Sequence, residues 1–280
     1  MIPAEFDYVV PSSLDEALAQ LAAGGEDAKV LAGGHSLVPL MKMRLAAPSL
    51  LVDVRRIPEL HGIRRTNGAW SFGALTRHAE LQSREELGLV AQVAKTIADQ
   101  QVRNRGTIGG SLAHGDPASD FPAVLLACEG SVGITGPDGE RHVDAADLFQ
   151  NYLTTAVGQG EILTHVHLPA LDGYGHAYEK FHRRAEDWAM VGVCALVRKG
   201  ADGSCEDVRV GLTHMGSVPL RATGVEEALR GGALDEGTIA RAAEQAAAGT
   251  EPPGDLNASP DYKRHLARVL TKRALITAAG

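Results

Sequence analysis

Cysteine is scarce in this sequence: Cys128, Cys194 and Cys205 are the three thiols in a chain of 280 residues. None of them forms a C-x-x-C pair, which argues against a zinc or iron–sulfur site within the chain and predicts no metal site. An odd, sparse set of cysteines also argues against a disulfide framework and favours a reducing compartment. Any redox centre must therefore be organic or be held by another polypeptide.

Positive charge and long apolar runs are lacking as well. The 27 Lys and Arg residues are outnumbered by 35 Asp and Glu, which gives a net charge of -8 and disfavours nucleic acid or an anionic membrane as a partner. The longest apolar runs, such as PAVLLAC at 122–128, are far too short to cross a bilayer. No charged segment followed by an apolar stretch opens the chain. We therefore expect a cytoplasmic protein with no transmembrane segment.

The composition that remains is that of a globular protein, with 44% hydrophobic and 22% charged residues in a chain long enough for two domains. Helical and strand patterns are mixed along the chain, which predicts an α+β fold. The character changes around ALDGYGHA at 170–177, where strand-like segments and then an alanine-rich helical tail begin. We place a domain boundary near residue 172.

Local signals predict several elements. A serine capping box and a terminal glycine pair delimit a helix within Pro11–Gly25, and apolar spacing predicts another over Leu87–Val102. Asp116 suits an N-cap position and Pro117 the first helical position, so we expect a helix to begin there. The Pro-Asp-Gly turn within Ser131–Val143 predicts a hairpin.

Two glycine-rich segments far apart in sequence are the strongest functional signal. They read AGGHS at 32–36 and TIGGS at 107–111. Backbone without side chains can approach a phosphate closely and offer several N–H groups at once, while Ser36, Thr107 and Ser111 add hydroxyl donors. The alternative is that both are tight turns, the usual role of a Gly-Gly pair. Neither segment matches the dinucleotide-binding or P-loop glycine spacing.

Longer motifs in a fixed order resemble one known family. AGGHSLVPLMKMR, VDVRRIPEL and QVRNRGTIGGSLAHGDPASDFPAVLLA are followed by GEILTHVHLP, YEKFHRRAEDWAMVGV and YKRHLARVLTKRAL. Together they resemble the flavin-binding medium subunit of molybdenum hydroxylases, the family of carbon monoxide dehydrogenase and xanthine dehydrogenase. The resemblance runs almost from end to end and implies a noncovalent FAD.

The resemblance also implies which residues bind FAD. Both glycine segments are expected on the pyrophosphate, Asp120 on hydroxyls of the sugar-like chain, Leu163 on the flavin ring and Lys180 near the isoalloxazine, where a cation favours the anionic reduced flavin. Read without the family, Asp120 and Lys180 are solvated charges and Leu163 is core. The full set expected to bind the cofactor is Ala32, Gly33, Gly34, His35, Ser36, Thr107, Ile108, Gly109, Gly110, Ser111, Asp120, Leu163, Lys180 and Trp188.

Trp188 departs from the pattern of the carbon monoxide dehydrogenases, which carry a tyrosine against the isoalloxazine at this place. An aromatic ring there is expected to stack on the flavin and to gate access to it, whereas the alternative role is a core anchor. Tryptophan is larger than tyrosine and offers only an N–H donor. The approach of an external oxidant is therefore expected to differ.

The family implies a fold and an assembly. The fold is a PCMH-type FAD-binding domain, 1–172, with subdomains of about 1–57 and 58–172 and FAD between them, plus a C-terminal domain, 173–280, with a three-stranded antiparallel sheet and helices. A large subunit is expected to carry the molybdenum cofactor and a small subunit the [2Fe-2S] clusters. Electrons are expected to pass from these clusters through FAD to NAD, a quinone or oxygen, so no residue of this chain need be catalytic toward the organic substrate.

Other interpretations remain open. One is a stand-alone FAD-dependent oxidase or reductase of the vanillyl-alcohol-oxidase-like group, whose members can bind flavin covalently through a histidine placed like His35. Another is a flavin-free scaffold that bridges subunits. His165 and His167 share one strand face, but two strand histidines with no third ligand are more typical of surface than of a metal site. Arg103 and Arg105 are candidates for contact with phosphate or with a partner, and the alternative is solvated charge at a helix end.

Overall fold

A small parallel sheet begins the chain, of which the computed structural model describes residues 2–280. Its strand order is β1-β3-β2, and it packs with α1 around the first apolar core. Its elements are β1 (Asp7–Val9), α1 (Leu14–Gly24), β2 (Ala28–Leu31), α2 (Leu37–Lys42) and β3 (Leu50–Asp53). The predicted first helix is confirmed as α1: the Ser13 hydroxyl accepts a hydrogen bond from the Glu16 N–H at 3.2 Å, and Gly25 ends the helix at φ +63.

An antiparallel sheet of five strands follows, in the order β4-β5-β10-β6-β7. The predicted hairpin is confirmed as β6 and β7, which pair from Ser131–Asp144 to Gly136–Gly139. The strands are β4 (Ile63–Thr66), β5 (Ala69–Gly73), β6 (Ser131–Gly136), β7 (Gly139–Asp144) and β10 (Ile162–Leu168), with the short pair β8 (Phe149–Asn151) and β9 (Thr154–Thr155) beside them. The helices are α3 (His78–Gln82), α4 (Leu89–Lys95), α5 (Gln100–Arg103), α6 (Ile108–His114), α7 (Asp120–Ala127) and α8 (Ala145–Leu148).

Two helix predictions in this part are wrong. The single helix expected over 87–102 is broken after Lys95, because Ala98 takes a positive φ of 42 and Asp99 caps a new short helix, α5. The helix expected to start at Asp116 begins only at Asp120. The Asp116 carboxylate instead accepts from the Ala118 N–H at 2.9 Å, which closes a turn before the helix.

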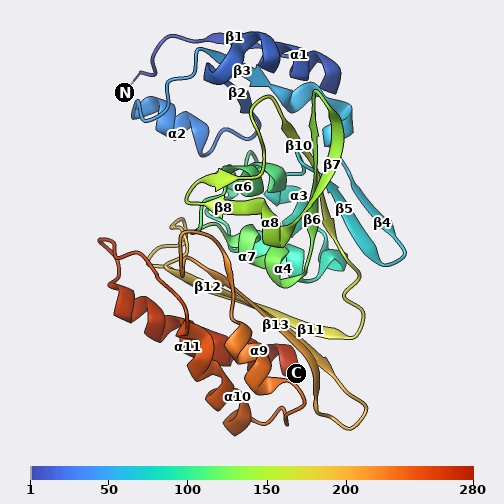
Figure 1. Cartoon of the computed structure of the whole chain (residues 1–280), viewed down its shortest axis with the longest axis vertical. Helices are drawn as coiled ribbons and strands as arrows, with labels where there is room; N and C mark the ends of the chain where they lie inside the picture. Colours follow the sequence, from blue (N-terminus) through green and yellow to red (C-terminus); the bar gives the residue numbers. More distant parts are fainter. Residues whose placement is uncertain (1) are drawn as a thin grey trace.

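The C-terminal part is an antiparallel sheet of four strands, β11-β12-β13-β14, where three were expected. The fourth strand is only two residues long, too short for an alternation pattern to reveal it. The elements are β11 (Tyr174–Phe181), β12 (Val191–Lys199), β13 (Cys205–Thr213), β14 (Leu220–Arg221), α9 (Thr223–Leu229), α10 (Glu236–Ala243) and α11 (Pro260–Ala279). Figure 1 shows α9, α10 and α11 on the outer side of this sheet. The mixed helix and sheet architecture confirms the α+β fold class.

Helix α7 lies between the five-stranded sheet and the C-terminal sheet (Figure 1). This position explains why the segment 121–127 is apolar on nearly every side, since a helix with neighbours on both faces has little polar surface. The contact with β13 is close: a Cβ added to Gly211 would lie 2.2 Å from the Ala123 carbonyl oxygen. Among residues 2–280, no helix combines the length and the apolar character needed to cross a membrane.

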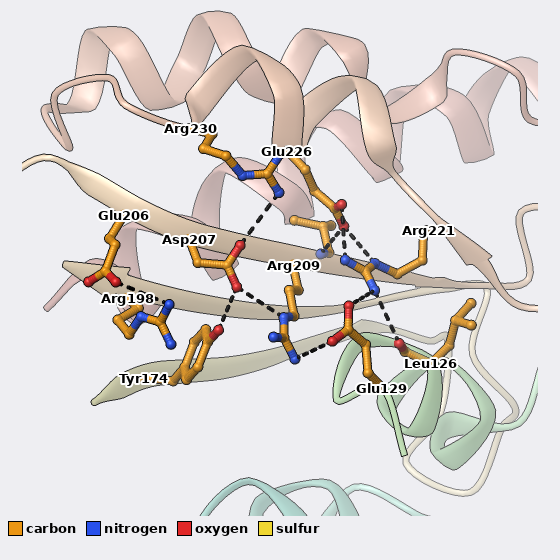
Figure 2. Close-up of polar contacts among 11 residues, drawn as sticks. Leu126, Glu129, Tyr174, Arg198, Glu206, Asp207, Arg209, Arg221, Glu226 and Arg230 are labelled. Carbon is orange, nitrogen blue, oxygen red and sulfur yellow. Dashed lines mark hydrogen bonds and ion pairs between the residues drawn. The ribbon is translucent and has the colours of Figure 1, made fainter. Parts of the chain in front are cut away.

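A network of charged residues joins the end of α7 to strands β13 and β14 (Figure 2). The Glu129 carboxylate pairs with Arg209 at 3.0 Å and with Arg221 at 3.3 Å. Arg221 also pairs with the buried Glu226 at 2.7 Å, and Arg209 with Asp207 at 3.1 Å. Residues before and after position 172 therefore share ionic as well as apolar contacts.

Candidate functional site

A cavity of about 380 Å³ is lined by segments that are far apart in sequence. They are the β2–α2 connection, α6, the start of α7, strand β10, the end of β11 and the loop that follows β11. The wall contains every residue assigned by resemblance except Ile108: Ala32, Gly33, Gly34, His35, Ser36, Thr107, Gly109, Gly110, Ser111, Asp120, Leu163, Lys180 and Trp188. Ile108 is 1% exposed and packs in the central core instead.

The first glycine segment, 32–36, presents free backbone donors at this cavity. The N–H groups of Gly33, Gly34, His35 and Ser36 donate to no acceptor among residues 2–280. Gly34 has a φ of +79, a conformation that favours glycine. Consecutive backbone N–H groups without internal partners are suited to the oxygen atoms of a phosphate.

The absence of a side chain at Gly33 has a separate cause. A Cβ at this position would lie 2.3 Å from the Arg105 carbonyl oxygen and 2.9 Å from the Gly106 Cα. The first glycine segment thus packs directly on the backbone that leads into the second. The sequence predicted that the backbone at Gly33 closely approaches another group. Part of that approach is made to the protein itself, at Arg105 and Gly106.

The second glycine segment is the first turn of α6 rather than a loop. Thr107 is its N-cap, and its hydroxyl accepts from the Gly110 N–H at 3.1 Å. The N–H of Ile108 donates to Thr76 and that of Gly109 to Ala74, so these donors are already used. A Cβ at Gly109 would lie 2.5 Å from that of Ala74, which makes this glycine a packing requirement.

His78 belongs to the site although nothing in its sequence context singled it out. It is 2% exposed, lines the cavity and stacks on Phe121 with ring centroids 5.5 Å apart. Its Nε2 lies 3.3 Å from the Ser111 hydroxyl, and its Nδ1 is buried with no partner among residues 2–280. Burial, together with the charges of Arg103 and His35, lowers the pKa of His78 to about 3, so the ring is neutral.

Two further histidines on the wall are also shifted toward the neutral form. Burial lowers the pKa of His35, and the nearby Arg105 acts in the same direction against the opposing charge of Asp99. Burial also lowers the pKa of His114, against the opposing charge of Asp116. His114 was not predicted either. The wall therefore combines neutral imidazoles with backbone and hydroxyl donors.

Asp120 and Lys180 form a buried ion pair at the cavity. The Lys180 ammonium lies 2.9 Å from one carboxylate oxygen of Asp120, and the two side chains are only 4% and 5% exposed. The Tyr178 hydroxyl donates to the other oxygen at 2.6 Å, and the ammonium also donates to the Thr96 carbonyl at 3.1 Å. The solvated alternative for both charges is wrong, because the sheet brings residues 60 positions apart into one buried contact.

Trp188 lies in the loop between β11 and β12 and is 53% exposed. It lines the cavity beside Glu186 and Asp187, so the alternative of a core anchor is wrong. The neighbouring Ala189 is buried, and the Met190 N–H donates to the Phe181 carbonyl at 2.8 Å, closing the loop at its base. A large aromatic ring thus stands at the solvent side of the wall.

The remaining candidates lie elsewhere. His165 and His167 do share one sheet face, with ring centroids 5.9 Å apart, and His142 stands 5.6 Å from His167. Within residues 2–280, no three His, Cys, Asp or Glu side chains are arranged to hold a metal ion. Arg103 donates to the carbonyls of Ile97 and Ala98, both at 2.7 Å, and so supports the break between α4 and α5.

These features define a class of protein. Backbone N–H groups and hydroxyls on the wall suit phosphate, while Leu163, Trp188 and the Lys180 ammonium add apolar, aromatic and cationic groups to the same wall. The fold and site are those of a cofactor-binding protein for a nucleotide that carries a phosphate group and a planar ring.

Comparisons with known proteins identify the family. The family described as "FAD binding domain in molybdopterin dehydrogenase" matches residues 4–171, and "CO dehydrogenase flavoprotein C-terminal domain" matches residues 176–278. The carbon monoxide dehydrogenase medium chain of Hydrogenophaga pseudoflava is 43% identical over 98% of this chain and 97% of its own length. Subunit alpha of the 6-hydroxypseudooxynicotine dehydrogenase complex of Paenarthrobacter nicotinovorans is 39% identical over 99% of this chain and 96% of its own length.

A solved structure agrees with these matches. Carbon monoxide dehydrogenase from Hydrogenophaga pseudoflava, in a form lacking the Mo-pyranopterin moiety of its molybdenum cofactor, superposes with a TM-score of 0.96 at 44% identity, covering 99% of this chain and 98% of that one. The chain belongs to the family of FAD-binding medium subunits of molybdenum hydroxylases, and it is a flavoprotein subunit of an oxidoreductase. The resemblance drawn from its motifs is confirmed.

Proposed function

We propose that this chain binds FAD noncovalently in the cavity and serves as the electron-transfer subunit of a molybdenum-containing dehydrogenase. The observation that carries the proposal is the convergence on one wall of residues 32–36, Thr107, residues 109–111, Asp120, Lys180 and Trp188. FAD, when bound, would accept and release electrons, and the chain would hold and tune it. None of its residues is assigned a catalytic role toward an organic substrate.

The chain's own groups have distinct proposed roles. The unpartnered N–H groups of Gly33 to Ser36 would bind the pyrophosphate, with the Ser36 and Ser111 hydroxyls beside them. Asp120 would hold hydroxyls of the sugar-like chain of the cofactor, and Lys180, paired with it, would lie near the isoalloxazine. Leu163 and Trp188 would pack on the flavin ring system.

Thr107 and Gly109 have packing and capping roles that need no ligand. Ile108, 1% exposed, would support the site from the core, where it holds the first turn of α6.

Assembly with other polypeptides is part of the proposal. Relatives carry the names medium chain or subunit of a complex, which supports a multi-subunit enzyme. We propose a large partner that carries the molybdenum cofactor, a small partner that carries [2Fe-2S] clusters, and NAD, a quinone or oxygen as the external acceptor. The relatives named above act on different molecules, so the substrate would be set by the large partner.

We also propose that the chain divides near residue 172, into a FAD-binding domain, 1–172, with subdomains of about 1–57 and 58–172, and a C-terminal domain, 173–280. Separate apolar clusters around the first sheet and around α11 support this division. The cytoplasm is the proposed compartment. Three free, buried cysteines fit a reducing environment.

The purified chain tests the central claim. We expect a yellow protein with one FAD per chain, no turnover of organic substrates by the chain alone, and release of all flavin into the supernatant on acid precipitation. Flavin that stays with the acid precipitate would show covalent attachment, with His35 as the residue to replace. A colourless chain that takes up no added FAD would contradict the proposal, and turnover by the chain alone would favour a stand-alone oxidase or reductase.

A further inference from the structure

His214 contacts three other segments of the chain at once. It follows β13 and has a φ of +63. Its backbone N–H donates to the Pro117 carbonyl at 2.8 Å, its Nδ1 lies 2.8 Å from the Ala189 carbonyl, and its Nε2 lies 3.3 Å from the Lys263 ammonium. One residue outside the cavity wall therefore links the segment before α7, the loop after β11 and helix α11.

The two carbonyls that His214 contacts belong to segments that carry cavity-lining residues. Pro117 stands three residues before Asp120, and Ala189 directly follows Trp188. Both Asp120 and Trp188 line the cavity, but no hydrogen bond between their two segments is present within residues 2–280. His214 thus provides a polar connection between the segment that carries the buried carboxylate and the loop that carries the exposed ring.

Lys263 is the unusual member of this group because its side chain is 0% exposed. A buried ammonium is rare unless it is paired, and here the Asp255 carboxylate lies 2.7 Å away. Hydrogen bonds from Lys263 and from the N–H groups of Asn257 and Ala258 outweigh the effect of burial and lower the pKa of Asp255. The Lys263 ammonium thus sits between the Asp255 carboxylate and the Nε2 of His214, which lies 3.3 Å away.

These partners dictate the tautomer of His214. The Ala189 carbonyl can only accept, so Nδ1 must carry the proton. The Lys263 ammonium can only donate, so Nε2 must be the unprotonated acceptor. Burial lowers the pKa of His214; the Ala189 carbonyl opposes this effect, the Lys263 charge reinforces it, and Asp255 and Asp116 oppose it. The geometry thus requires a neutral ring with the proton on Nδ1.

We propose that His214, held in this tautomer by Lys263, is a positioning residue that fixes the Trp188 loop against the segment leading into Asp120. The inference deepens the proposed function, because the ring it would position is the one expected to cover the flavin. It assigns a role to a buried lysine and a histidine that do not touch the cavity.

The first test follows Trp188 without any flavin. Trp70 is the only other tryptophan, so a Trp70→Phe chain labelled with fluorotryptophan gives a single ¹⁹F resonance. In this background, His214→Gly keeps a backbone that tolerates the left-handed φ but removes the ring. His214→Asn also tolerates that φ, and its amide N–H can replace the Nδ1 donor. His265→Asn, on the exposed face of α11, is the matched control.

We expect the ¹⁹F resonance to move and broaden in H214G, and to stay in place in H214N and H265N. An unchanged resonance in H214G, or an equal change in H214N and H214G, would overturn the role of the Nδ1 donor. With FAD added, we expect the Kd to rise about tenfold in H214G, the equivalent of about 1.4 kcal/mol, and less than about twofold in H214N. The resonance is read without flavin. If no protein in the series bound FAD, including the Trp70→Phe parent, that result would count against the proposed function and leave the positioning role of His214 intact.

A second test reads the histidine itself and does not depend on the folding of H214G. Long-range ¹H–¹⁵N spectra report the tautomer and protonation of each imidazole, and the His214 signals are those missing in H214N. In the wild type we expect the Nδ1–H form to persist from about pH 8 to about pH 6. Lys263→Met keeps an apolar chain of similar length but removes the charge that disfavours protonation, while Asp255 and Asp116 remain, so His214 should protonate at a higher pH than in the wild type. A wild-type Nε2–H tautomer, or identical titrations in both proteins, would refute the assignment.

Discussion

Gly33 and Arg105 meet backbone to backbone: a Cβ on Gly33 would lie 2.3 Å from the Arg105 carbonyl oxygen. This contact brings the two glycine segments together at one side of the cavity. Even the smallest side chain at position 33 would force them apart, because a carbonyl oxygen held in the backbone cannot rotate away.

We therefore expect Gly33→Ala to weaken FAD binding by at least about tenfold, as measured by flavin titration. Gly224→Ala is the matched control, since a Cβ there meets Gln245 at an ordinary 3.4 Å. It should leave FAD binding unchanged. Equal FAD affinity in both variants would show that the packing of residue 33 does not shape the site.

Because Asp120 and Lys180 form a buried ion pair, we expect the effects of replacing them on the free energy of unfolding to be strongly coupled. Both side chains are buried, so replacing either one leaves an uncompensated charge, which costs about 3–5 kcal/mol. We expect Asp120→Asn and Lys180→Met each to lower the free energy of unfolding by about this amount in urea melts. The double variant should lose much less than the sum of the two, and additive losses would contradict the buried pairing.

The lowered pKa of His78 predicts that the folded protein loses stability in mild acid. Burial, aided by the charges of Arg103 and His35, lowers the pKa of His78 to about 3, so the unfolded chain binds the proton more readily than the folded one. The contribution of the neutral ring to the free energy of unfolding is fully present above a pH of about 6.5, which is the pKa of histidine in the unfolded chain. This contribution decreases as the pH falls below that value.

Between pH 7.5 and pH 5.5, we expect the wild type to lose about 1 kcal/mol more than His78→Gln, measured by urea unfolding at both values. His61→Gln, at an exposed position, should follow the wild type. Parallel losses in the wild type and the His78 variant would mean that the ring is protonated in the folded state.

Arg221 allows a comparison of two carboxylates with very different exposure. The Glu226 side chain is 6% exposed and also accepts from the Val210 N–H at 2.8 Å, whereas the Glu129 side chain is 55% exposed. We expect Glu226→Gln to lower the free energy of unfolding by about 1.5–3 kcal/mol, because a buried charge-assisted hydrogen bond is lost. Glu129→Gln should cost less than about 1 kcal/mol. Equal effects in thermal or urea melts would contradict this ranking.

Local sequence signals were sufficient where a residue and its partner are near neighbours. The cap of α1 by Ser13 and the hairpin of β6 and β7 depend on contacts within a few positions, and both were predicted. The apolar spacing over 87–102 predicted one long helix because periodicity does not detect the positive φ at Ala98. Arg103 stabilises that break through carbonyls five and six residues away, a contact that no spacing rule includes.

The residues of the candidate site were likewise only partly predictable from the sequence. Motifs in order were enough to indicate the family and all of the wall residues assigned by resemblance except Ile108, which faces the core. His78 and His114 carried no signal, since a histidine in a polar stretch is ordinary until the fold buries it.

By itself, the sequence determined the chemical groups available: backbone without side chains at 33–34, the hydroxyls of Ser36, Thr107 and Ser111, and few aromatic rings. The tertiary structure decided what those groups contact. It paired Asp120 with Lys180, and it placed His214 between Pro117, Ala189 and Lys263. The reason is physical: charge pairing, burial and tautomer depend on atoms brought within about 3 Å by packing, and separation along the chain does not encode that distance.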